Sequence, residues 1–192
     1  MADSVRRVAV DAMGGDNAPA DIVRGAVRAV QELGVPVTLV GRRDAIEPVL
    51  RESGDTPDGL AVVDASEVVE MNEHPASAVR NKRDSSIVRA CALVASDDCG
   101  AAVSAGNSGA MLAAALFSVK RVPGIARPAI GAAFPSASGR TFILDVGANT
   151  DCRPEWLAQF AVMGDVYARS MMGIEQPRVA LLSNGEEAEK GS

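Results

Sequence analysis

A glycine-rich stretch in the middle of the chain constrains the fold most strongly. Residues 104–110 read SAGNSGA; they follow the apolar run AAV at 101–103 and precede the helix-like pattern MLAAALF at 111–117. The apolar run is typical of a short buried strand, and the two glycines allow a tight turn at little steric cost. A helix that begins here directs its free N–H groups and its positive dipole end above the strand. The stretch therefore predicts a strand, a turn and a helix N-terminus suited to an anion.

An isolated Gly-x-x-Gly is equally typical of close packing at a strand-to-helix corner. In this chain, however, polar or basic loops recur at four other junctions, namely 11–17, the region near Lys82, 145–149 and 183–190. Loops that follow parallel strands lie along one edge of the sheet, and ligands bind there where the strand order reverses. We therefore expect these loops to converge on one ligand site.

Apolar strands alternate with amphipathic helical patterns through the first part of the chain. Strands are expected at 8–10, 37–40, 60–63 and 101–103, with helices at 19–33, 45–51 and 87–94. This spacing predicts right-handed crossovers and a parallel sheet.

The second part of the chain continues with further strand and helix patterns. Strands are expected at 128–134, 141–144 and 179–182, and a long helix is expected after Pro154. The whole chain, residues 1–192, is predicted to be a single α/β domain.

Composition excludes several classes of protein. With 47% apolar residues the chain can bury a sizeable core, and its net charge of −6 argues against a general nucleic-acid binder. Three widely spaced cysteines suggest neither a disulfide framework nor a zinc knuckle. This cysteine usage indicates a reducing, cytoplasmic setting by default. No stretch resembles a signal peptide or a membrane span, so any membrane contact is expected to be peripheral.

The motifs for several common chemistries are missing from the sequence. The one histidine, His74, precedes Pro75 in an acidic turn, which does not favour a Ser-His-Asp triad. The first strand is not followed by Gly-x-Gly-x-x-Gly, and there is no Walker A motif. No cofactor and no metal site are expected. A basic cluster of Arg80, Lys82 and Arg83 fits either a solvated helix face or a collar of cations beside an anionic substrate.

Four motifs together carry a resemblance to a known family. They are DAMGGD at 11–16, SAGNSGA at 104–110, DVGAN at 145–149, and GEE at 185–187 with Lys190-Gly191. In this order they resemble the PlsX family, the acyl-acyl-carrier-protein:phosphate acyltransferases of bacterial phospholipid synthesis. The resemblance implies a homodimeric, Rossmann-like α/β/α sandwich with a mainly parallel sheet, related in shape to phosphate acetyltransferases and isocitrate dehydrogenases. It also implies that acyl carrier protein and inorganic phosphate are the partners, with acyl phosphate as the product.

That reaction needs an anion cradle near a thioester and donors for the oxyanion that forms. By resemblance, Lys190 is expected to orient phosphate, and Asn107 is the second expected catalytic residue. Asp16 and Asp145 are expected to orient their neighbours rather than touch an anion. The other expected substrate-binding positions are Gly14, Gly15, Asp16, Lys82, Arg83, Ser104, Gly106, Ser108, Gly109 and Asn149.

The sequence also departs from the family. Family members continue well beyond residue 192 with further strands, part of the active site and an amphipathic segment thought to touch the membrane, and Asn184 replaces a usually apolar residue. The chain is therefore expected to be the N-terminal part of a longer acyltransferase and inactive or unstable alone. Two alternatives stay open: a phosphate acetyltransferase-like enzyme that uses a coenzyme A thioester, and a non-catalytic anion-binding protein.

Overall fold

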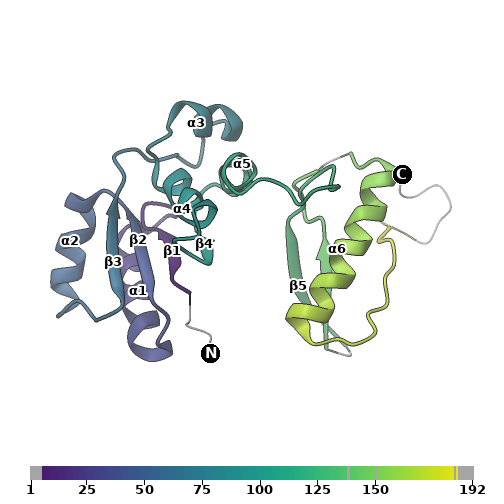
Figure 1. The fold of residues 1–192 in the computed structure, drawn as a ribbon, viewed down its shortest axis with the longest axis horizontal. Coiled ribbons are helices and arrows are strands. Elements are labelled where there is room, and N and C mark those ends of the chain that lie inside the picture. Colours follow the sequence, from purple (N-terminus) through teal and green to yellow (C-terminus); the bar gives the residue numbers. More distant parts are fainter. Residues whose placement is uncertain (1–5, 138, 150, 184, 186–192) are drawn as a thin grey trace. The chain divides into compact units, whose positions relative to one another are not determined.

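The computed structural model describes residues 6–137, 139–149, 151–183 and 185. Contacts between Cα atoms divide the chain into an N-terminal unit, Met1–Lys120, and a C-terminal unit, Arg121–Ser192. Each unit is described by itself (Figure 1). The single domain expected from the sequence stays a prediction.

The N-terminal unit is built on a four-stranded parallel sheet with the order β3-β2-β1-β4. Its strands are β1 Val8–Asp11, β2 Val37–Gly41, β3 Leu60–Asp64 and β4 Ala101–Val103. The parallel pairing confirms the sheet predicted from the alternation of strands and helices. Because β1 lies between β2 and β4, the direction in which the strands are added reverses at β1. The carboxyl ends of β1 and β4 are therefore neighbours at a switch point.

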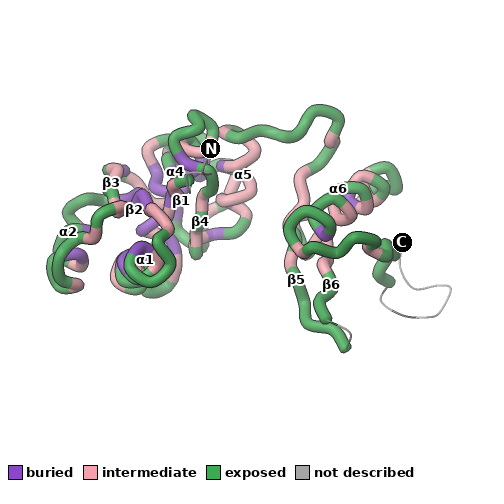
Figure 2. The backbone as a smooth tube through the Cα atoms, turned by 60° about the horizontal axis from the view of Figure 1, so that its bottom comes forward, coloured by how far each residue is buried: buried purple, intermediate pink, exposed green. Residues whose placement is uncertain are grey.

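Within residues 6–120, five helices accompany this sheet. They are α1 Ala20–Leu33, α2 Arg43–Glu52, α3 Pro75–Asn81, α4 Ser86–Ala95 and α5 Ser108–Ser118. On one face of the sheet, α1 and α2 bury a cluster that includes Val23, Leu39 and Ile46. On the other face, Ala90 of α4 packs in a cluster with Ala9 and Val40. Neighbouring positions along the strands thus enter opposite clusters, as the alternation of side chains along a strand requires. Figure 2 shows the buried residues concentrated along these contacts.

A third apolar cluster packs α3 and α5 onto α4. Its buried members are Val69, Ala78, Val79, Ile87, Cys91, Ala110 and Ala114. The small side chains of α5 allow the helix to approach α4 closely. This cluster fixes the start of α5 beside the end of β4.

The described residues of the C-terminal unit form an antiparallel hairpin and one long helix. β5 Gly131–Ser136 pairs with β6 Gly139–Leu144, and α6 Pro154–Met172 packs against β6. Phe160 of α6 is 3% exposed, and the ring of Tyr167 stacks on Phe142 with centroids 4.2 Å apart. The long helix expected after Pro154 is confirmed, and the strand expected at 128–134 begins three residues later.

One predicted strand is wrong. Residues 179–182 have no regular secondary structure, and Leu181 and Leu182 are 77% and 80% exposed. An apolar run becomes a strand only where a neighbouring strand accepts its hydrogen bonds and a packed surface covers its side chains. Among the described residues, this run has neither.

Candidate functional site

The loops that follow β1 and β4 are tied together by a buried carboxylate. Asp11 ends β1 with only 2% of its surface exposed. Its Oδ2 accepts a 2.7 Å hydrogen bond from Ser104 Oγ, and its Oδ1 accepts one of 3.1 Å from the N–H of Met13. The N–H of Gly106 in turn donates to Ser104 Oγ at 3.0 Å. A relay from Gly106 through Ser104 to Asp11 therefore sets the shape of both loops.

Two glycines make this close approach possible. A Cβ atom on Gly14 would lie 2.6 Å from Asp11 Oδ2 and 2.8 Å from the nitrogen of Gly106. A Cβ atom on Gly106 would lie 3.1 Å from Gly14 Cα. Gly15 has a φ of +112°, a conformation that residues with a side chain rarely adopt. The glycines of the two loops thus bring one backbone against the other at the switch point.

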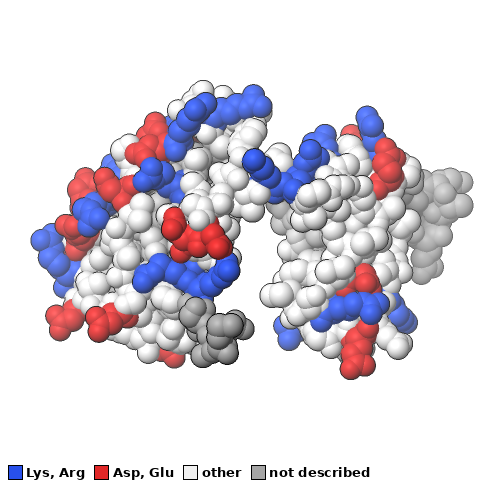
Figure 3. Space-filling model, in the orientation of Figure 1, with Lys and Arg blue, Asp and Glu red and all other residues white. Residues whose placement is uncertain are grey.

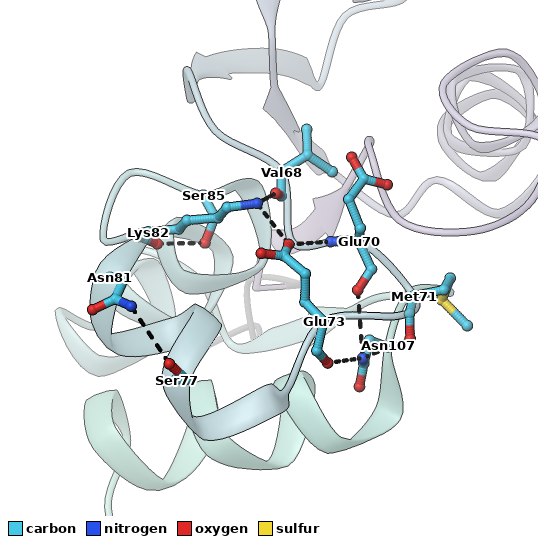
Figure 4. A network of polar contacts seen from close by, with 9 residues as sticks. All are labelled: Val68, Glu70, Met71, Glu73, Ser77, Asn81, Lys82, Ser85 and Asn107. Carbon is cyan, nitrogen blue, oxygen red and sulfur yellow. Dashed lines mark hydrogen bonds and ion pairs between the residues drawn. The ribbon is translucent and has the colours of Figure 1, made fainter.

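Asn107 is the N-cap of α5, and its side chain also binds the loop of residues 70–73. Its Oδ1 accepts a 3.0 Å hydrogen bond from the N–H of Ala110. Its Nδ2 donates to the carbonyls of Met71 and Glu73 at 3.1 and 3.3 Å (Figure 4). The side chain therefore holds residues 70–73 against the beginning of α5. This arrangement describes a positioning residue, and an Asn107 contact to substrate stays a prediction.

The first turn of α5 presents the backbone donors. Ser108 and Gly109 begin the helix, where N–H groups have no intrahelical acceptor. Ser108 is exposed, whereas Gly109 is half-buried, and a Cβ atom on Gly109 would lie 2.7 Å from Pro75 Cγ. Because the N–H of Ala110 already bonds Asn107 Oδ1, the first turn of α5 leaves the N–H groups of Ser108 and Gly109 for an anion.

Lys82 is committed to an ion pair within the protein. Its Nζ donates to Glu73 Oε2 at 2.6 Å and to the carbonyl of Val68 at 2.7 Å (Figure 4). The same carboxylate oxygen accepts a 2.8 Å hydrogen bond from the N–H of Glu70. These bonds, the one from Lys82 first, lower the pKa of Glu73. Lys82, at the end of α3, and Asn107, at the start of α5, thus both bind the turn that contains Glu73. Arg83 is exposed.

The DVGAN loop in the C-terminal unit closes on its own carboxylate. Asp145 Oδ2 accepts hydrogen bonds from the backbone and side-chain nitrogens of Asn149 at 2.6 and 2.8 Å. Asp145 Oδ1 accepts from the N–H groups of Ile130 and Ala148 at 3.1 and 3.0 Å. Burial acts to raise the pKa of Asp145, but these bonds outweigh it, and the pKa is lower than usual. The orienting role expected for Asp145 agrees with this geometry.

The structure brings three of the five expected loops together. The loops at 11–17 and 104–110 meet at the switch point, and the region of Lys82 adjoins them through Asn107. The loop at 145–149 belongs to the other unit. Lys190 lies outside the described residues, as does most of the loop at 183–190. Asp16 and Gly15 lie in the first loop, exposed and half-buried respectively.

Sequence reasoning missed the roles of Asp11 and Glu73. An acid that ends an otherwise apolar strand is the signal that could have identified Asp11, because a buried carboxylate requires hydrogen-bond donors.

Among the described residues, no cluster of three His, Cys, Asp or Glu side chains could hold a metal ion. No described helix has the length and apolarity needed to cross a membrane.

A parallel sheet with glycine-rich loops at its switch point places the N-terminal unit in the Rossmann-like class of α/β proteins. The chain belongs to the family described as fatty acid synthesis protein, whose model matches residues 6–192. This membership confirms the resemblance carried by the four motifs.

Curated relatives match nearly the whole chain. It is 55% identical to a phosphate acyltransferase of Geotalea uraniireducens (strain Rf4), with 97% of this chain and 54% of the relative covered. It is 52% identical to a phosphate acyltransferase of Heliobacterium modesticaldum, with 97% and 56% covered. The chain therefore spans about half the length of the curated relatives it matches.

Proposed function

We propose that this chain is part of an enzyme that transfers a fatty acyl group from acyl carrier protein to inorganic phosphate. The observation that supports this proposal most is the corner at the switch point, where Asp11 and Ser104 fix two glycine-rich loops beside the first turn of α5. Helix N-termini at such corners bind phosphate groups. The name of the relatives, phosphate acyltransferase, agrees with this chemistry.

In the proposed reaction, a phosphate oxygen attacks the carbonyl carbon of the acyl thioester. The tetrahedral intermediate then expels the thiolate, so that a C–O bond forms and the C–S bond breaks. The proton of the attacking hydrogen phosphate passes to the thiolate, which gives acyl phosphate and a free thiol. Phosphate is an anion at neutral pH and a thiolate leaves readily, so no strong base is needed. The protein has to hold phosphate close to the carbonyl and to donate hydrogen bonds to the oxyanion.

We assign the phosphate cradle to the N–H groups of Ser108 and Gly109, together with the hydroxyl of Ser108. Lys190 is proposed to orient phosphate and to offset the developing charge. Asn149 is proposed as a further contributor, although its side chain already binds Asp145 and the carbonyl of Pro128. A homodimer in the cytoplasm, with peripheral membrane contact through segments beyond residue 192, completes the proposal.

The test is acyl phosphate formation by the full-length protein, followed by trapping the product with hydroxylamine. Acyl carrier protein and coenzyme A are compared as acyl carriers, each with and without inorganic phosphate. We expect phosphate-dependent product with the acyl carrier protein thioester. Product from the coenzyme A thioester alone would favour the phosphate acetyltransferase-like alternative, and phosphate binding without product from either would favour a non-catalytic protein.

A further inference from the structure

Three arginines gather where α6 begins in the C-terminal unit. The guanidinium carbons of Arg127 and Arg153 lie 4.7 and 5.4 Å from the centroid of the Trp156 ring, within the range of cation–π attraction. The guanidinium of Arg121 donates to the carbonyls of Ile125 and Ala126, next to Arg127. We call Arg121, Arg127 and Arg153 the arginine patch. Figure 3 shows basic side chains, with acidic ones among them, at this end of the unit.

The loop that carries two of these arginines is fixed to the first turns of α6. Gln159 Oε1 accepts a 2.8 Å hydrogen bond from the N–H of Ala126, and Gln159 Nε2 donates to the carbonyl of Gly124 at 3.0 Å. The half-buried indole of Trp156 supports both Arg127 and Arg153. The arginine patch is therefore held in place before any partner arrives, which reduces the entropy lost on binding.

The arginine patch forms no ion pair with the described residues, although the acids Asp151 and Glu155 flank Arg153 in the sequence. Among the described residues of the C-terminal unit, Arg169 forms an ion pair with Asp165, and no ion pair includes an arginine of the patch. No Asp or Glu occurs between Asp98 and Asp145, although the chain as a whole carries a net charge of −6. All three arginines are exposed.

We infer that the arginine patch is a docking surface for an acidic face of a partner protein; within the proposed function, on which this inference rests, that partner is acyl carrier protein. Guanidinium groups that are fixed in position match carboxylates in a planar, two-point geometry. A lipid surface is favoured less, because binding in the membrane interface requires aromatic or large apolar side chains that are free to insert. Here the indole of Trp156 lies against two guanidinium groups.

The experiment measures binding of acyl carrier protein to the full-length protein at low and at physiological ionic strength. We expect the double variant Arg127→Glu/Arg153→Glu to weaken binding by roughly tenfold or more at low salt, with a smaller difference at higher salt. Arg140→Glu is the matched control: Arg140 is an exposed arginine of β6 in the same acid-free stretch, and its reversal should change binding by less than roughly twofold. If the double variant and Arg140→Glu weaken the binding of acyl carrier protein equally, the arginine patch is not a specific docking surface.

Additional measurements distinguish docking of a protein from binding to a membrane. The double variant Arg127→Gln/Arg153→Gln repeats the binding test without introducing negative charge. Thermal unfolding checks that this variant is as stable as the unmodified protein. Binding to anionic phospholipid vesicles that the double variant abolishes, with unchanged binding of acyl carrier protein, would overturn the inference in favour of a membrane surface. Transfer from a coenzyme A thioester, which lacks the protein partner, should be unaffected by the double variant. Absence of acyl transfer by the unmodified protein from either donor would instead count against the proposed function.

Discussion

The hydroxyl of Ser104 donates a 2.7 Å hydrogen bond to the buried carboxylate of Asp11, from which it is separated by 93 positions in the sequence. This bond joins the ends of two adjacent parallel strands at the point where the strand order reverses. The same hydroxyl accepts the N–H of Gly106, so one side chain fixes the geometry of both loops.

Ser104→Ala should therefore destabilise the N-terminal unit. The substitution leaves a buried carboxylate oxygen without its donor, which costs about 1–3 kcal/mol. Denaturant unfolding measures the loss. Ser77→Ala, at an exposed position of α3, is the control and should change stability by no more than about 0.5 kcal/mol. Equal stabilities of the two variants would contradict the role of the bond.

Gly14→Ala should disrupt the corner itself. The new Cβ atom would lie 2.6 Å from Asp11 Oδ2, so the two loops must separate, and we expect at least about 1–3 kcal/mol of destabilisation with loss of phosphate binding. Gly25→Ala in α1 is the matched control, because its Cβ atom meets nothing within 4 Å. That change should stabilise the helix by roughly 0.5–1 kcal/mol. Unfolding curves of both variants, with phosphate titration, decide between these outcomes.

Asn107 offers a test that separates its two contacts. Asn107→Ala removes both the helix cap and the bonds to the carbonyls of Met71 and Glu73, whereas Asn107→Ser can still cap α5. Amide hydrogen exchange should accelerate in residues 70–74 of both variants, but in the first turn of α5 only with alanine. The alanine variant should lose about 0.5–2 kcal/mol of stability through the cap alone. Unchanged exchange in residues 70–74 would show that Asn107 does not hold that loop.

The ion pair between Lys82 and Glu73 predicts a pH dependence. Because Lys82 lowers the pKa of Glu73 in the folded state, the resulting stabilisation is present above the unfolded pKa of about 4.3 and is lost as the pH falls through the folded value. Lys82→Met should raise the pKa of Glu73 and flatten this acid limb. NMR titration of the Glu73 carboxyl reports the first effect, and unfolding at a series of pH values reports the second. If the pKa of Glu73 does not change in the variant, the ion pair with Lys82 is not the cause of the lowered pKa.

The cysteines should differ in reactivity. Burial, followed by the nearby charge of Asp11, raises the pKa of the Cys91 thiol to about 11, so little thiolate exists at pH 8. Cys152 is half-buried. A thiol reagent should therefore label Cys152 first in the folded protein, with Cys91 labelled only after unfolding. Mass spectrometry of the labelled peptides measures the order, and rapid modification of Cys91 in the native state would contradict it.

Much of the N-terminal unit could be predicted from the sequence because its signals are local. The strand that contains Val37 and Leu39 is rich in β-branched residues and buried on both faces, and Gly34, with a φ of 66°, ends the preceding helix. The same reasoning failed at residues 179–182, where apolar composition alone carries no information about a pairing partner.

The meeting of the two loops could be predicted in part for the same reason. Glycines that permit a close approach are visible in the sequence. It could therefore be predicted that the loops containing Gly14 and Gly106 meet, but not which of their atoms are in contact. The partner of Lys82 was not, because a cluster of basic residues does not reveal which carboxylate faces it. The relay through Ser104 depends on a contact between distant segments, which no local pattern encodes.

The position of a bound anion tests the central claim most directly. Crystals of the full-length protein soaked in tungstate, an electron-dense analogue of phosphate, would show the anion in an anomalous difference map. We predict a peak about 3 Å from the backbone nitrogens of Ser108 and Gly109, at the corner fixed by Asp11 and Ser104. Tungstate bound elsewhere, with none at the first turn of α5, would contradict the proposed phosphate site.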